Sequence, residues 1–255
     1  MDACAVMRGS KNGLEKKTRD SRAPCLLNID GDICHHLQNA SKKLCAPFDY
    51  WVESLFTDLH TDHRWSVDLR EKLAEVCEIL GIKFTTPEKF VSHRWMTCYD
   101  IAAGILRLWD EYYVFYFGFL KLEDRNIYKP VIRKILNDRK VSELAKAKLN
   151  SVHNYLKKKS MTSDGKMRKT RIFEKVLFLE KRTLLVFHFY TSVFPILKEY
   201  VMMSQTKQPM VHRLFDKQVE LFKVFITHFL KPEAYSRRSG KQIKAVEIEE
   251  NKFLS

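Results

Sequence analysis

Hydrophobic residues recur at helical spacing over most of the chain from residue 32 onward. In the stretch 37–59 the apolar positions fall on one helical face, and Pro47 is expected to kink or restart the helix. Ser66 suits the N-cap of a following helix, whose apolar stripe comprises Leu69, Leu73, Val76, Cys77 and Leu80. Gly81 is placed to end that helix. These spacings predict a mainly helical protein.

A second group of apolar stretches follows Trp95. Residues 101–109 continue a helical register into residues 112–119, which are apolar nearly all round, so this helix is expected to be buried. Lys129-Pro130 is expected to start a further helix that ends at Asn137-Asp138.

The last third of the chain alternates between charged and apolar stretches. A charged amphipathic helix is expected to run to Lys159, and residues 160–169 read as an exposed loop. Two long helices then close the fold, one from about Ile172 past Pro195 and one over residues 211–229. Lys231-Pro232 should break the second.

Residues 1–40 differ from the rest. The short apolar run 24–30, bounded by Pro24 and by Asp30-Gly31-Asp32, reads as a buried strand. It is the one place where the pattern indicates β structure. Beyond Tyr235 the chain is charged and reads as a loosely held tail.

Composition supports a packed, basic protein. Hydrophobic residues make up 45% of the chain, and only 8 Gly and 7 Pro argue against a turn-rich β sandwich or a disordered chain. The net charge of +14 suits a partner that carries phosphates, either nucleic acid or an anionic membrane surface. Seven basic residues against one acid, Asp164, give a local net charge of +6 between 157 and 171. They are Lys157, Lys158, Lys159, Lys166, Arg168, Lys169 and Arg171. Two interpretations remain open, a solvated surface and a phosphate-contacting patch.

The cysteines and the start of the chain bear on location. Six scattered Cys read as reduced thiols of an intracellular protein, in nucleus or cytoplasm. We expect no signal peptide and no membrane span, because the longest apolar run is about half of the ~20 residues a span needs. Cys34-His35 raises the question of zinc, but a second ligand pair is missing, so structural packing is favoured. No metal site and no cofactor are predicted.

Three blocks in order carry a family resemblance. Asp2 stands five residues before Met7-Arg8-Gly9, Cys34-His35 runs into Asn39-Ala40, and Arg94-Trp95 precedes a helix. Together they resemble the transposases of the hAT superfamily. The resemblance implies that Asp2 is the second catalytic acid of a ribonuclease-H-like core and that Cys34, His35 and Asn39 belong to its architecture. It also implies that Trp95 stacks on a flipped base, with Arg94 beside it on the DNA. The alternative is a packed Trp95 with Arg94 as its surface neighbour.

The expected fold class is therefore mainly α, with a helical insertion domain and a small N-terminal α/β remnant of the ribonuclease-H-like core. The remnant would span residues 1–40, the helical insertion 41–235 and the charged tail 236–255. Two-metal phosphodiester chemistry needs several carboxylates, and only Asp2 is matched, so no enzyme activity is expected.

We expect a catalytically incomplete nuclear protein that binds DNA non-specifically and does not act on membranes. Two alternatives remain: a helical module for protein partners or self-association, and an incomplete piece of a longer active transposase.

Overall fold

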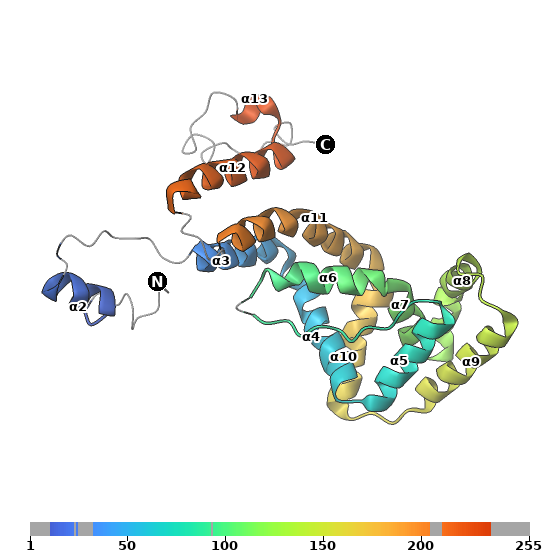
Figure 1. Ribbon diagram of the computed structural model, residues 1–255. Helices are drawn as coiled ribbons and strands as arrows, with labels where there is room; N and C mark the ends of the chain where they lie inside the picture. Colours follow the sequence, from blue (N-terminus) through green and yellow to red (C-terminus); the bar gives the residue numbers. More distant parts are fainter. Residues whose placement is uncertain (1–10, 23, 25–32, 93, 205–210, 236–255) are drawn as a thin grey trace. The chain divides into compact units, whose positions relative to one another are not determined.

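The computed structural model describes residues 11–22, 24, 33–92, 94–204 and 211–235 (Figure 1). These residues are mainly helical and contain no strand, which confirms the helical class. The strand expected at 24–30 lies outside the described residues except for Pro24. Asp2 and the tail 236–255 lie outside them as well.

The chain divides into two compact units. The terminal unit combines Met1–Ser41 with Val193–Ser255, and the central unit is Lys42–Ser192. The described helices of the terminal unit are α2 (Leu14–Ser21), the first part of α3 (Ile33–Cys45), the end of α11 (Glu180–Ser204), α12 (Val211–Phe229) and α13 (Pro232–Tyr235). As predicted, the helix over 211–229 stops before Lys231-Pro232.

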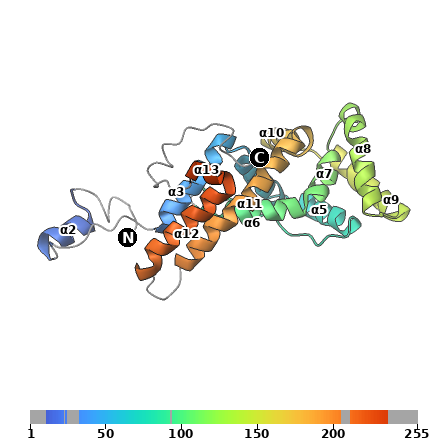
Figure 2. The same cartoon turned by 90° about the horizontal axis from the view of Figure 1, so that it is seen from above.

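The central unit holds the largest core. Its elements are the 3-10 turn η1 (Ala46–Phe48), α4 (Trp51–Arg64), α5 (Val67–Ile79), α6 (Thr97–Arg107), α7 (Trp109–Phe117), α8 (Leu122–Asp138), α9 (Glu143–Lys158), α10 (Ser163–Phe173), the π-turn η2 (Glu174–Phe178) and the first part of α11. Helix α4 packs against α5 and α10, while α9 packs against α5. Helix α7 packs against α5 and α8, and the three stay neighbours in the view from above (Figure 2).

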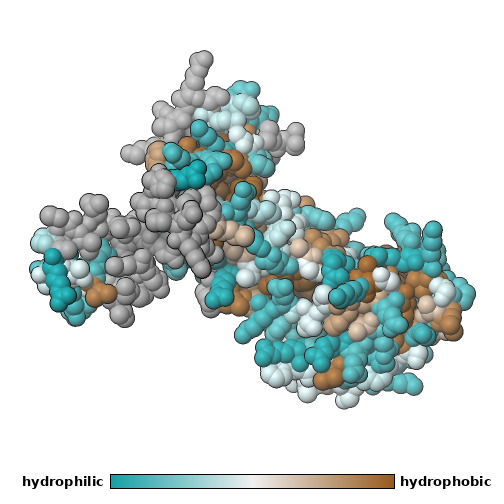
Figure 3. Space-filling view, viewed as in Figure 1, coloured by the Kyte–Doolittle hydropathy of each residue, from teal (hydrophilic) through white to brown (hydrophobic). Residues whose placement is uncertain are grey.

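The aromatic helix α7 is buried all round, as its sequence predicted. Tyr112, Tyr113 and Tyr116 are among the largest fully enclosed side chains of the described residues. Phe56 of α4 stacks on Phe187 of α11 with ring centroids 5.7 Å apart, which joins two more helices to the same core. The face of the central unit seen in Figure 3 mixes hydrophilic and hydrophobic residues.

Several helix ends fall where the sequence placed them. Pro47 sits in η1, and Asp49 and Tyr50 then take left-handed backbone conformations before α4 restarts the helical path. Ser66 is the N-cap of α5, although its hydroxyl donates to Asp68 Oδ1 (2.6 Å) instead of accepting from the backbone. Gly81 has φ +74°, a conformation that glycine adopts without strain, and it ends the turn after α5.

Other boundaries differ from the prediction. The helix expected to be continuous over 101–119 breaks at Leu108, whose φ of −107° separates α6 from α7. Helix α8 starts at Leu122 and contains Pro130, so Lys129-Pro130 does not start it. Pro130 removes one helical N–H, and the carbonyl that loses its donor belongs to Asn126, an exposed residue that water can solvate.

The predicted loop 160–169 was wrong in its main part, because α10 begins at Ser163. The side chain of Thr162 caps this helix by accepting a hydrogen bond from the Gly165 N–H (3.2 Å). The long helix expected from Ile172 is also interrupted, since the π-turn η2 and Leu179 separate α10 from α11. Helix α11 then continues through Pro195 as predicted.

Candidate nucleic-acid interface

Helix α4 turns all of its carboxylates inward. Glu53, Asp58 and Asp62 are each at most 6% exposed, although α4 lies at the surface of the central unit. The residues that α4 leaves exposed or half-buried on its outer side are Ser54, Thr57, His60, Thr61 and Arg64. Hydroxyl and basic side chains are the groups that contact phosphate oxygens in protein–DNA complexes. The outer face of α4 therefore offers such groups without a competing acid of its own.

The inward carboxylates are held by partners on neighbouring helices. Asp58 accepts a two-pronged ion pair from Arg171 of α10, at 2.9 Å from Nε and 2.6 Å from Nη2. Asp62 accepts hydrogen bonds from Lys169 and from the Tyr116 hydroxyl (3.0 Å). Because a charged group is costly to bury without partners, these contacts explain why the acids face the interior.

The predicted basic segment is largely occupied by these same contacts. Lys169 is only 2% exposed, Arg168 lies 3.9 Å from Asp62, and Lys159 pairs with Asp68 at the start of α5. With Asp58, Asp62 and Asp68 included, the local net charge falls from +6 to +3. Lys157, Lys158 and Lys166 are exposed and make no ion pair with a described residue.

Burial sets the protonation states beneath α4. It lowers the pKa of His63 to about 4, so this imidazole is neutral near pH 7. Since the Tyr116 hydroxyl donates to Asp62, His63 Nε2 must donate to the Tyr116 oxygen (3.1 Å), which leaves Nδ1 without a proton. Burial also lowers the pKa of Lys169, against the opposing pull of Asp62. The network is enclosed and ties α4, α7 and α10 together.

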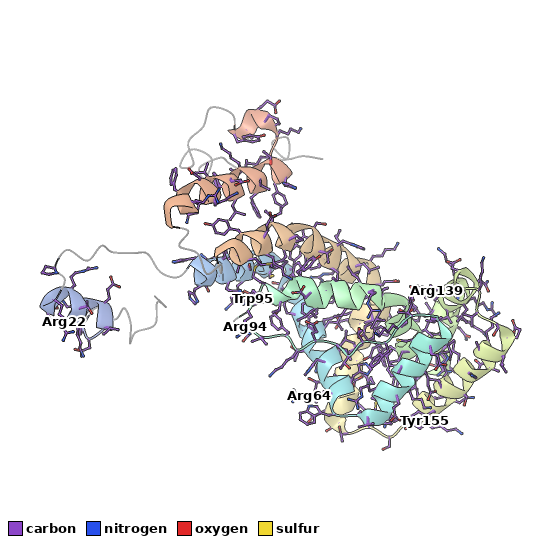
Figure 4. The ribbon with its side chains drawn as sticks, viewed as in Figure 1. Arg22, Arg64, Arg94, Trp95, Arg139 and Tyr155 are labelled. Atoms are coloured by element: carbon purple, nitrogen blue, oxygen red, sulfur yellow. The ribbon has the colours of Figure 1, made fainter. Side chains whose placement is uncertain are left out.

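The corner between α4 and α5 carries an exposed aromatic residue. Trp65 is 75% exposed, and the guanidinium carbon of Arg64 lies 4.9 Å from its ring centroid. Figure 4 shows Arg64 at the end of α4 and Tyr155 near the end of α9, both on the lower edge of the central unit in that view. The Tyr155 hydroxyl donates to Asp68 Oδ2 (2.7 Å), which fastens α9 to the first turn of α5.

At this edge, the Asp68 carboxylate accepts hydrogen bonds from three side chains. Burial alone would raise its pKa, but hydrogen bonds from Lys159, Ser66 and Tyr155 hold the pKa well below its usual range. The carboxylate is therefore ionised and already paired. Lys72 and Lys159 both lie over the Tyr155 ring, with ammonium nitrogens 5.5 and 6.0 Å from the centroid.

The other predicted pair, Arg94-Trp95, is divided between surface and core (Figure 4). Arg94 is exposed, whereas Trp95 is 6% exposed, with its ring centroid 5.3 Å from both Tyr50 and Phe90. The packed alternative describes this position of Trp95. Stacking on a base would require the ring to leave these neighbours.

The tripeptide His-Arg-Trp occurs twice, at 63–65 and at 93–95. In the first copy His63 falls on the buried face of α4 and Trp65 lies just beyond the end of the helix, in solvent. Trp65, Arg64 and Tyr155 were not among the residues predicted from the sequence. The repeated tripeptide was the signal that could have directed attention to Trp65.

The remaining predicted site residues within the described ranges belong to the terminal unit. Cys34, His35 and Asn39 lie in α3, where His35 and Asn39 are exposed. Within the described ranges, no three His, Cys, Asp or Glu side chains form a metal-binding group. None of the described helices is long and apolar enough to cross a membrane.

Comparisons with protein-family models, with curated proteins and with solved structures give no match for this chain. The resemblance to hAT transposases therefore rests on the three sequence blocks alone.

Proposed function

We propose that this chain is a catalytically inactive, hAT transposase-derived protein that binds DNA. The proposed interface comprises the outer face of α4 and the exposed lysines of α9 and α10. The observation that carries this proposal is the inward orientation of all three α4 carboxylates, which leaves hydroxyl and basic groups outside. The +14 net charge of the chain adds long-range attraction to phosphate.

The binding would be dominated by phosphate contacts and insensitive to sequence. Lys157, Lys158 and Lys166 are exposed and have no carboxylate partner among the described residues, so their ammonium groups are available to phosphate. Each neutralised phosphate of a duplex releases counterions and contributes about −0.9 to the slope of log K against log salt concentration.

A salt titration with matched variants tests the interface. Replacing Lys157, Lys158 and Lys166 with Ala should weaken binding of a labelled duplex in fluorescence anisotropy and flatten the salt slope by up to about 2.7. Lys129, Arg133 and Lys134 of α8 are also exposed, and their replacement with Ala removes the same charge as a control. Equal effects of the two triple variants would show that the binding is diffuse. Absence of duplex binding at low salt would overturn the proposal.

The absence of catalysis is proposed because Asp2 is the only acid that matches the hAT pattern. Purified protein with Mg²⁺ or Mn²⁺ should leave a DNA hairpin intact, and Asp2→Ala should leave DNA affinity unchanged. Metal-dependent nicking that Asp2→Ala abolishes would contradict this part of the proposal.

A second function, association with protein, is favoured by one feature of the terminal unit. Helix α12 exposes Phe215 and Phe222, and a groove of about 410 Å³ lies between α11 and α12. If this surface mediates self-association, Phe215→Ser with Phe222→Ser should convert the assembly to monomers in sedimentation experiments. Monomeric sedimentation of the unmodified chain at high concentration would exclude self-association through α12.

A further inference from the structure

Trp65 differs from the other tryptophans of the chain in its exposure. Trp95 and Trp109 are buried, and the Trp109 Nε1–H donates to Glu180 (3.1 Å). Trp51 is half-buried, with Lys175 and Arg182 4.9 and 4.3 Å from its ring. Trp65 alone among the four leaves three quarters of its surface in solvent. Trp carries the largest π-face of any side chain, so this position offers a large stacking surface to a ligand.

The backbone that carries the Trp65 ring is held in place. Trp65 is the C-cap of α4 and the next residue, Ser66, is the N-cap of α5, so helices hold the backbone on both sides. Arg64 lies over the indole, and three quarters of the Trp65 surface is accessible to solvent. A ligand that stacks there meets a backbone that is already ordered, which reduces the entropic cost of binding.

The charges around the ring favour a nucleic acid. Arg64 is next to the ring, and Lys157, Lys158 and Lys166 belong to the helices that pack against α5 and α4. Among the nearby acids, Asp68 is engaged by Lys159 and Tyr155, whereas Glu71 and Asp164 are exposed. An exposed aromatic face on a basic surface is the combination with which proteins bind single strands, because every base has a π-face.

We infer that Trp65 stacks on an unpaired base, so that single-stranded nucleic acid is the preferred ligand of this interface. The inference rests on the proposed DNA-binding function and specifies its substrate. In a duplex the bases are already stacked, and a ring at a helix corner reaches a base face only if a base is unstacked at a cost of a few kcal/mol. The lysines contact either form, whereas Trp65 contacts only the unpaired one.

Equilibrium binding of oligothymidylate, oligouridylate and a duplex with the same number of phosphates tests the inference. Trp65→Ala should weaken oligothymidylate binding about 5- to 150-fold, the range expected for the loss of one stacked base, and leave duplex binding within about twofold. Trp65→Phe keeps an aromatic face and should restore most of the loss. Because Trp65 is exposed, both variants should unfold at the same temperature as the unmodified protein.

Tryptophan fluorescence gives an independent readout. Stacking should quench the emission when oligothymidylate is added, and Trp65→Phe should remove that quenching, because Trp95 and Trp109 are buried and Trp51 is flanked by cations. The oligouridylate arm distinguishes DNA from RNA as the source of the unpaired base, and either result is compatible with stacking.

The experiments distinguish failure of the stacking inference from failure of the proposed DNA-binding function. If Trp65→Ala leaves oligothymidylate affinity unchanged while the lysine triple variant weakens it, the stacking inference is wrong and the proposed function stands. Equal losses on single strands and duplexes would also overturn base stacking. If no nucleic acid binds at low salt, both ideas fail, and binding of the chain to anionic lipid vesicles that Trp65→Ala weakens would identify a membrane surface instead.

Discussion

The Tyr116 hydroxyl of α7 donates a 3.0 Å hydrogen bond to Asp62 of α4, at the point where Lys169 of α10 reaches the same carboxylate. Three helices that are far apart in the sequence thus meet at one buried oxygen. The arrangement binds a segment that the sequence indicated as loop to the core of the central unit.

The first prediction concerns this buried ion pair. Asp62→Ala should lower the free energy of unfolding by about 3–5 kcal/mol, because the amine of Lys169 is left buried without its counter-ion. The double variant Asp62→Ala with Lys169→Met removes the uncompensated charge and should recover much of the loss. Urea unfolding of the single and double variants measures the difference. A double variant as unstable as the single one would show that the pair matters through packing alone.

The second prediction concerns pH. Burial lowers the pKa of both His63 and His153 from 6.5 to about 4. Between pH 6.5 and pH 4 the unfolded chain therefore binds more protons than the folded chain. As the pH falls through this range, each histidine lowers the free energy of unfolding by about 3 kcal/mol. Stability above pH 6.5 is unaffected by this effect.

His153→Gln isolates the contribution of one histidine. The His153 Nε2–H donates to the Val114 carbonyl (2.9 Å), and a glutamine amide can replace that hydrogen bond without titrating. Burial raises the pKa of Glu53 and Glu111, which acts in the opposite direction, so the comparison with the unmodified protein is essential. The variant should lose less stability between pH 6.5 and 4. If the free energy of unfolding changes with pH in the same way for His153→Gln and the unmodified protein, the lowered pKa of His153 is refuted.

The third prediction uses two glycines in helical surroundings. A Cβ at Gly118 would lie 2.8 Å from Leu156 Cδ1 and 2.9 Å from His153 Cδ2, so Gly118→Ala should destabilise by about 1–3 kcal/mol. A Cβ at Gly104 in α6 meets nothing within 4 Å, so Gly104→Ala should stabilise by about 0.5–1 kcal/mol. Thermal unfolding of both variants checks the opposite signs. A tolerated alanine at Gly118 would mean that α9 can move away from α7.

The fourth prediction separates the two copies of His-Arg-Trp. Trp95→Ala should cost about 3–5 kcal/mol of stability, because the ring packs against Tyr50 and Phe90. At a temperature where the variant is folded, its nucleic-acid affinity should match that of the unmodified protein. If Trp95→Ala weakens binding to a substrate with an unpaired base and leaves the melting temperature unchanged, the stacking role implied by the hAT resemblance belongs to Trp95.

The fifth prediction tests the cap that starts α10. Thr162→Ala removes the acceptor for the Gly165 N–H and should cost about 1 kcal/mol. Thr162→Asn retains an acceptor and should cost little. A loss with both variants would show that the threonine methyl group, not its oxygen, stabilises the turn.

The sequence predicted the features that depend on local chemistry. Apolar spacing identified α5 and α12, Ser66 and Gly81 fixed the ends of α5, and the aromatic run identified a buried α7. The sequence pattern did not predict helix α10, because this segment is polar and contains Gly165. That helix is stabilised by Lys169 and Arg171 contacting acids more than 100 residues earlier in the chain, which no local pattern encodes.

The candidate site could be predicted only in part, for the same reason. Exposed Lys157, Lys158 and Lys166 have the same residue type as buried Lys169, and only tertiary contacts distinguish them. Trp65 and Trp95 follow identical His-Arg dipeptides, yet one ends a helix in solvent and the other packs beside Phe90. Neither a count of charges nor a motif match distinguishes these two positions.

Because some lysines are exposed and others are buried, their reactivity toward amine reagents depends on whether the protein is folded and whether a ligand is bound. Amine-reactive reagents modify ammonium groups that solvent can reach, so Lys157, Lys158 and Lys166 should label rapidly in the native protein. Lys169 and Lys175, both buried, should label only when the central unit opens. Mass spectrometry of labelled peptides would then report two events separately: protection of the first group by a bound ligand, and exposure of the second by unfolding.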